Sequence, residues 1–146
     1  MNGWDDPATA RAYQEFETRH TRYALANRAL ARHAELRPGL AVLDLAAGCG
    51  GTVAAILPAL GATGRMDAVE PAHAMAALGR RRFAADARVR WLDALDAAGS
   101  GYARITCGAA IWQWPNLDQL FAQLAARLAP GGALVFNIPA AYLGRA

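Results

Sequence analysis

Residues 40–51 read LAVLDLAAGCGG, a short apolar run that ends at Asp44-Leu45 and continues into a glycine-rich segment. The pattern predicts a strand over 40–45, a loop over 46–51 and a helix over 52–60. Glycines in such a loop let a ligand approach the backbone without meeting a Cβ atom. The following helix N-terminus offers unpaired N–H donors and partial positive charge. The segment therefore predicts a ligand-binding loop at the end of a buried strand.

Strands and helices alternate on the C-terminal side of this loop. Apolar runs predict further strands at 65–70, 89–92, 103–107 and 133–136, and helical patterns fall at 52–60, 71–85 and 117–128. The last helix is expected to end at the Pro-Gly-Gly run 130–132. Alternation of this kind predicts an α/β fold, with a Rossmann-like, doubly wound parallel sheet covered on both faces.

The N-terminal segment has a helical pattern of its own. Asp6-Pro7 suits a helix start, and no Gly or Pro follows until the Arg37-Pro38-Gly39 run. One long or broken amphipathic helix is expected there, with a stripe that contains Tyr13, Phe16, His20, Tyr23 and Leu30. We therefore expect one domain overall, in which residues 1–37 form a helical cap and residues 38–146 form the ligand-binding core.

Composition excludes several classes of protein. The 146 residues include fifteen arginines and no lysine, with a net charge of +3, and 55% are hydrophobic, so an ordered domain is expected. Two cysteines and three scattered histidines show no metal-ligand or disulfide spacing. Scattered arginines do not favour nucleic acid. The uncharged run 45–64 is interrupted by glycines and Pro58, and the N-terminus lacks a signal peptide, so a cytoplasmic protein without a membrane span is expected.

Two classes of cofactor fit the glycine loop. A dinucleotide fingerprint can be read as Ala46-x-Gly48-x-x-Gly51, and Glu70 is placed to bind the ribose hydroxyls of either cofactor. Asp44 would repel a pyrophosphate, whereas a carboxylate at that position suits a cationic ammonium group. A helical segment also precedes the first strand, which is unusual for a dinucleotide domain. An NAD-dependent oxidoreductase therefore stays a less favoured alternative.

Four segments in order resemble the motifs of class I S-adenosylmethionine-dependent methyltransferases of small-molecule type. The segments are VLDLAAGCGG at 42–51, MDAVEPAHAMAALGRRR at 66–82, VRWLDALDA at 89–97 and ARLAPGGALVFNIP at 126–139. The resemblance runs from about Ala41 to Pro139. Ala46 replaces the first glycine of the family motif, and Tyr102-Ala103 stands where an aromatic-Asp pair is usual. No N-P-P-Y motif is present, which disfavours methylation of nucleic-acid or protein-glutamine nitrogen.

The resemblance implies S-adenosylmethionine as cofactor and a strand order of 3-2-1-4-5. It also implies a role for individual residues of the core. The methionine part would be held by Asp44, Ala46, Gly48, Cys49, Gly50 and Cys107. Glu70 would accept hydrogen bonds from both ribose hydroxyls, because a carboxylate is an acceptor with two oxygens. The adenine would lie against Pro71, Met75, Asp93 and Ala94.

Candidate substrate residues come from the cap and from two strand ends. His20 has a side chain suited to a general base, although packing or hydrogen bonding under the cap is the favoured explanation. Tyr13 and Tyr23 could face the sulfonium, since a cation favours an aromatic face, or could simply fill the core. Trp112 and Asn137 follow the fourth and fifth strands, where a substrate rim is expected.

The family fold has seven strands, but the sequence predicts five. The C-terminal antiparallel strand pair is therefore expected to be missing, which leaves the fifth strand with an open edge that could pair with a second copy in a homodimer. We expect methyl transfer to a small molecule. The alternative is a catalytically inactive or truncated methyltransferase-like module that serves in binding or assembly.

Overall fold

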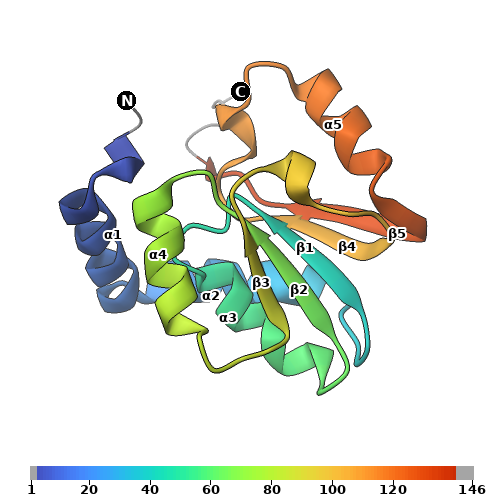
Figure 1. Cartoon of the computed structure of the whole chain (residues 1–146), viewed down its shortest axis with the longest axis horizontal. Coiled ribbons are helices and arrows are strands. Elements are labelled where there is room, and N and C mark those ends of the chain that lie inside the picture. Colours follow the sequence, from blue (N-terminus) through green and yellow to red (C-terminus); the bar gives the residue numbers. More distant parts are fainter. Residues whose placement is uncertain (1–2, 141–146) are drawn as a thin grey trace.

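A parallel sheet of five strands organises the computed structural model, which describes residues 3–140 (Figure 1). The sheet order is β3-β2-β1-β4-β5, and every neighbouring pair is parallel. The strands are β1 (Ala41–Leu45), β2 (Arg65–Val69), β3 (Val89–Leu92), β4 (Tyr102–Cys107) and β5 (Leu128–Phe136). This order confirms the predicted doubly wound, Rossmann-like fold. No antiparallel strand pair occurs within residues 3–140, and the last six residues assigned to the core lie outside the described part.

The register places the end of β1 at the centre of the sheet. Asp44 lies between Ala68 of β2 and Thr106 of β4. Strand order reverses between β1 and β4, because β2 and β3 extend to one side and β5 to the other. In open α/β sheets this switch point creates a crevice at the carboxyl ends of the strands, where ligands bind. The register therefore puts the glycine loop at that crevice.

Helices cover both faces of the sheet. On one face, α2 (Thr21–His33), α3 (Gly51–Ile56) and the 3-10 helix η2 (Leu57–Leu60) pack against alternate β1 and β2 residues, including Val42 and Met66. On the other face, α5 (Leu117–Ala125) packs against Leu43, Leu45 and Ile105. Neither α2 nor any other helix in residues 3–140 is long and apolar enough to cross a membrane.

The cap consists of two helices, one of the two alternatives predicted for the N-terminal segment. Asp6 caps α1 (Pro7–Arg19) by accepting a hydrogen bond of 2.8 Å from the Thr9 N–H. His20 adopts an extended backbone, ends α1 and precedes α2. Figure 1 shows α1 beside α4 (His73–Arg82), with the short helix η1 (Gly3–Asp5) at its start. Asp5 accepts a hydrogen bond of 2.8 Å from the His73 N–H, which joins η1 to the start of α4.

The predicted end of the last helix was wrong. The sequence placed Leu128 on a helix that runs to Pro130, whereas α5 ends at Ala125 and Leu128 begins β5. The Pro-Gly-Gly run lies inside this strand, where the pairing with β4 shifts register and Gly131 takes a φ of 74°. Proline is tolerated there because β5 is at the edge of the sheet, where a missing N–H donor breaks no second ladder.

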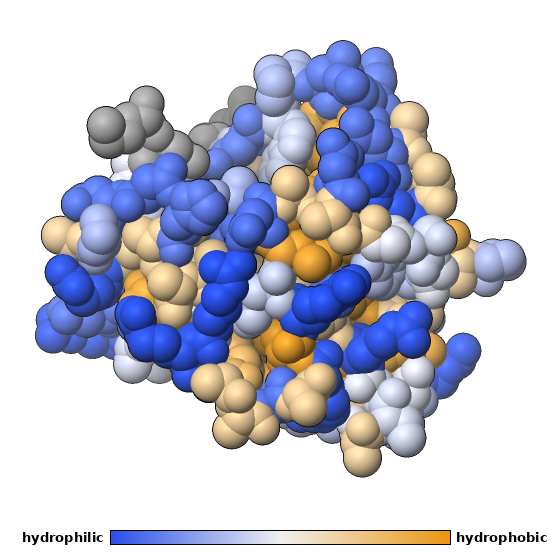
Figure 2. Space-filling view, in the orientation of Figure 1, coloured by the Kyte–Doolittle hydropathy of each residue, from blue (hydrophilic) through white to orange (hydrophobic). Residues whose placement is uncertain are grey.

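A polar bridge crosses the sheet on the α5 side. Arg90 of β3 pairs with Asp67 of β2 at 2.7 Å, and Tyr102 of β4 donates a hydrogen bond of 2.5 Å to the same carboxylate. Burial raises the pKa of Asp67, but the Arg90 and Tyr102 bonds outweigh burial and hold it below its usual value. Figure 2 shows apolar surface between polar residues in the middle of this face. The bridge places polar side chains over the β2 and β3 part of this face, beside α5.

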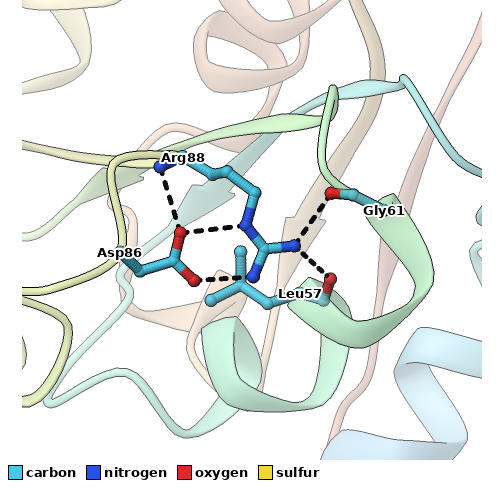
Figure 3. Close-up of polar contacts among 4 residues, drawn as sticks. All are labelled: Leu57, Gly61, Asp86 and Arg88. Carbon is cyan, nitrogen blue, oxygen red and sulfur yellow. Dashed lines mark hydrogen bonds and ion pairs between the residues drawn. The ribbon is translucent and has the colours of Figure 1, made fainter.

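A second arginine joins the turns that precede β2 and β3, at the amino ends of these strands (Figure 3). Arg88, just before β3, donates to the carbonyl oxygens of Leu57 at 3.0 Å and Gly61 at 2.9 Å. Its guanidinium also binds Asp86 through two hydrogen bonds of 2.9 and 2.6 Å. One side chain thus joins the end of η2 to the turn that leads into β3.

We predict that Arg88→Met lowers the free energy of unfolding more than a substitution at an unpaired surface arginine does, because two carbonyls and a carboxylate lose a charged donor. Urea unfolding measures the difference. Arg28→Met is the matched control, since Arg28 is exposed on α2 and makes no ion pair in the described structure. Equal stability of the two variants would contradict a joining role for Arg88.

Candidate functional site

The glycine loop bends through three residues with left-handed backbone. Ala46, Gly48 and Gly50 have φ values of 56°, 56° and 91°. Ala46 stands where the family motif has glycine, and an alanine in this conformation costs about 1 kcal/mol. At Gly50 the Phe83 ring occupies the space that a Cβ would need, so that position requires glycine. The loop is thus held in one strained shape at the end of β1.

Glu70 fixes this loop to the end of β2. Its side chain is buried, one oxygen accepts from the Gly48 N–H at 2.8 Å, and the other accepts from the Ala72 N–H at 2.8 Å. Burial raises the pKa of Glu70, while the two N–H donors partly offset that effect. A carboxylate held in this way can accept further hydrogen bonds, because each oxygen has a second lone pair.

Asp44 has a buried oxygen with no hydrogen-bond donor. The side chain is 1% exposed, and Thr106 Oγ1 donates to Oδ1 at 2.7 Å. Oδ2 has no partner among the described residues. Burial raises the pKa of Asp44 to about 7, the Thr106 bond opposes that rise, and the charge of Glu70 adds to it. A buried carboxylate with a free oxygen suits a cationic ligand group.

Two cap residues that the sequence analysis missed lie against the loop. Glu17 of α1 accepts a hydrogen bond of 3.0 Å from the Cys49 thiol, and Asn27 of α2 accepts one of 3.3 Å from Thr52. A Cβ at Gly51 would collide with Glu17 and would lie 2.8 Å from the Asn27 amide nitrogen. Burial and the Glu17 carboxylate raise the pKa of Cys49 to about 12, so its thiol stays neutral.

A spacing signal could have found both cap residues. Glu17 lies four residues after Tyr13, and Asn27 lies four residues after Tyr23, so each shares a helix face with a tyrosine. The sequence analysis used these tyrosines but did not follow their faces to the next turn. Asn27 and Glu17 therefore extend the predicted methionine end of the site.

A cavity of about 740 Å³ opens between the cap, the glycine loop and the segment after β4. Eight of the predicted site residues line it, namely Tyr13, Tyr23, Ala46, Gly48, Glu70, Pro71, Met75 and Trp112. A smaller space of about 40 Å³ shares part of this lining and is also bordered by Glu17, Asn27 and Cys49. The structure thus brings together the loop, the β2 acid and the cap aromatics.

Other predicted residues lie outside both cavities. His20 is exposed at the α1–α2 junction, where its ring contacts Phe16 at 4.0 Å between centroids. Asp93 is 61% exposed and pairs with Arg80 at 2.6 Å. Asn137 instead fixes the turn after β4, because its Oδ1 accepts from the Ala109 N–H at 2.6 Å. The remaining residues outside the two linings are Asp44 and Cys107, which are buried at strand ends, and Gly50 and Ala94.

The titratable side chains do not form a metal centre. Within residues 3–140, no group of three or more His, Cys, Asp and Glu side chains could hold a metal ion. Both cysteines are free and buried. The arrangement offers instead carboxylates around a glycine loop and an aromatic cavity, which suits an organic ligand with cationic and hydroxyl groups.

Solved structures share this fold. The chain is 16% identical to the protein bound to the Trm112 methyltransferase activator of Haloferax volcanii, with a TM-score of 0.78, and the match covers 94% of this chain and 61% of that one. It is 15% identical to an S-adenosylmethionine-dependent methyltransferase of Aquifex aeolicus, with a TM-score of 0.75, and that match covers 90% of this chain and 71% of the Aquifex protein. It is 20% identical to an S-adenosylmethionine-dependent methyltransferase of Thiobacillus denitrificans in complex with S-adenosylhomocysteine. The TM-score is 0.64, and the match covers 76% of this chain and 46% of the Thiobacillus protein.

These comparisons define the family but not the whole protein. The chain spans less than two-thirds of the length of the Haloferax and Thiobacillus proteins. No curated protein matches the chain. The family model described as "Methyltransferase domain" matches residues 42–132, which contain the glycine loop, Glu70 and all five strands apart from Ala41 of β1 and the end of β5. The chain belongs to the methyltransferase domain family.

Proposed function

We propose that the protein transfers a methyl group from S-adenosylmethionine to a small-molecule acceptor. The observation that carries this proposal is the free, buried Oδ2 of Asp44 beside a left-handed glycine loop fixed by Glu70. The donor set fits the cofactor, which presents an ammonium group, two ribose hydroxyls and an apolar adenine. The methyltransferase family model supports the reaction class.

Each part of the cofactor has matching residues. The ammonium group is assigned to Asp44 and Glu17, and the ribose hydroxyls to Glu70. The loop residues Ala46, Gly48, Cys49 and Gly50, together with Cys107, would hold the methionine part. Pro71 and Met75, which line the large cavity, would pack against the adenine. Asp93 and Ala94 stay assigned to the adenine edge, which requires Asp93 to exchange Arg80 for the adenine amino group.

The protein contributes position and a dry environment to the transfer. The bound cofactor supplies an electrophilic methyl group on a sulfonium, and the reaction needs the acceptor in line with it. Ala46 and Gly48 would hold the methionine end, and Tyr13 and Tyr23 of the cap border the same cavity and would cover the reacting groups. His20, the base suggested by the sequence, lies outside that cavity, so we assign no proton transfer to it.

The cap favours a small acceptor in this proposal. The cavity of about 740 Å³ must hold both the cofactor and the acceptor, and the cap helices enclose it from one side. No arginine within residues 3–140 lines it, which argues against a nucleic-acid substrate. The two free cysteines fit a reducing compartment, so we place the protein in the cytoplasm.

We predict that the protein binds S-adenosylhomocysteine and that Glu70→Gln and Glu17→Gln each weaken binding at least tenfold. The first variant loses a carboxylate for the ribose, and the second loses a negative charge near the ammonium group. Isothermal titration calorimetry gives the dissociation constants. Glu15→Gln is the matched control, since Glu15 lies on the same helix but is exposed and pairs with Arg19. A wild-type protein that binds no S-adenosylhomocysteine would defeat the proposal.

A second prediction concerns Asp44 and pH. Because its pKa rises from an ordinary 3.8 to about 7 on folding, the folded state favours the neutral acid. Wild-type stability therefore falls between pH 4 and pH 7 relative to Asp44→Asn, which is neutral throughout, by up to about 4 kcal/mol. Urea unfolding of both proteins at pH 4.5 and pH 8 measures the change. Saturating S-adenosylhomocysteine should reduce this loss of stability with rising pH. A stability difference between wild type and Asp44→Asn that does not change with pH would contradict the raised pKa of Asp44.

An assembly role is the second candidate function. The outer edge of β5 is unpaired within the described residues, and Phe121 and Phe136 nearby are exposed with their rings 6.3 Å apart. Apolar side chains beside an open edge favour pairing with another strand. We propose a homodimer through this edge. Analytical ultracentrifugation should show a dimer that Phe136→Lys dissociates, and a monomer at all concentrations would contradict the pairing.

A further inference from the structure

Five aromatic side chains in the described part of the chain line the large cavity. Trp4, Tyr13 and Tyr23 come from the cap, and Trp112 and Trp114 come from the segment after β4. The Trp4 and Tyr13 rings meet edge to face with centroids 5.3 Å apart, and the Tyr13 and Tyr23 rings do so at 6.1 Å. Rings from both sides therefore enclose the space above the loop.

Within residues 3–140, the lining of this cavity contains no positively charged side chain. None of the fourteen arginines in that part of the chain lines the cavity, and neither does a histidine. Glu70 is the single charged residue among those that line it. A carboxylate or phosphate on the acceptor would be buried there without a partner, which is strongly unfavourable. The charge of the cavity therefore selects against anionic acceptors and accepts neutral or cationic ones.

The wall also lacks a general base. Burial and the nearby Glu17 carboxylate raise the pKa of Tyr13, so its hydroxyl stays neutral. The Cys49 thiol keeps its proton and donates a hydrogen bond to Glu17. Glu70 is held by two N–H groups and is assigned to the ribose hydroxyls. An alcohol or phenol must lose a proton before it attacks, whereas a neutral amine has a lone pair available. The site suits an acceptor that needs no base in the cavity, because an alkylammonium can lose its extra proton to water before the reaction, whereas an alcohol is far too weak an acid to do so.

We propose that the acceptor is an amine nitrogen on an apolar, aromatic body that carries no carboxylate or phosphate. This inference rests on the proposed function. An amine that is protonated at neutral pH first releases one proton to water. The nitrogen lone pair then forms a bond to the methyl carbon of S-adenosylmethionine, while the carbon–sulfur bond breaks and its electron pair stays on sulfur. The nitrogen gains the positive charge that the sulfonium loses. A primary or secondary amine then releases one proton to water, and a tertiary amine keeps its charge.

The aromatic wall stabilises the charge that the nitrogen acquires. A cation over the face of Trp or Tyr gains about 0.5–2 kcal/mol, more where water is excluded. Trp4, Tyr13 and Tyr23 are placed to provide such faces, and the same rings pack against the planar body of the acceptor. One wall thus serves both recognition of the body and stabilisation of the cation.

The experiment compares acceptors that differ in one group. Phenethylamine and tryptamine are each paired with the amino acid that adds a carboxylate, phenylalanine and tryptophan, and 2-phenylethanol tests an alcohol. Calorimetry on protein saturated with S-adenosylhomocysteine measures binding, and labelled S-adenosylmethionine measures transfer. We expect both amines to bind at least tenfold more tightly than their amino acids. We expect label on the amines and none on the alcohol.

Two variants test the wall itself. Gln113→Arg places a positive charge in the cavity and should remove the preference for amine over amino acid. Trp4→Leu should weaken amine binding at least fivefold, whereas Phe121→Leu, an exposed aromatic outside the cavity, should not. If S-adenosylhomocysteine binds but the amino acids bind as tightly as the amines, the inference is overturned and the proposed function stands. Failure to bind S-adenosylhomocysteine overturns the proposed function, and the inference with it.

Discussion

The Glu70 carboxylate is the interaction on which the site depends. Its two hydrogen bonds, to the Gly48 and Ala72 N–H groups, join the glycine loop after β1 to the end of β2. The loop contains an alanine and two glycines in left-handed conformation, and a strained loop keeps its shape only where its surroundings hold it. The parallel register brings the two strand ends together, so the sheet itself supplies the acid that fixes the loop.

The cap completes what the sheet begins. Glu17 contacts Cys49 and Asn27 contacts Thr52, so both cap helices reach the same loop that Glu70 fixes. The free oxygen of Asp44 lies at the adjacent strand end. Negative groups therefore surround one end of the site, while aromatic side chains surround the other. Such a division of charge suits a ligand that is cationic at one end and planar elsewhere.

Much of the fold could be predicted from the sequence because strand and helix periods are local properties. The alternation after residue 40 predicted five strands, and the motif order predicted their arrangement, which the sheet confirms. The end of the last helix could not be predicted, because Leu128 fits a helical stripe until its pairing with Tyr102 is known. Within the site, Glu70 and the loop were predictable from spacing, whereas Glu17 and Asn27 were missed because they belong to the cap.

The sequence by itself determined the strand–loop–helix unit, the acids at the ends of two strands and the aromatic stripe of the cap. The tertiary structure decided which of these residues share one cavity. His20 belongs to the same stripe as Tyr13 and Tyr23, yet the break between α1 and α2 leaves it exposed. The physical reason is that helix periodicity fixes only the face of a side chain, whereas the break and the packing of α1 against α4 fix where that face points.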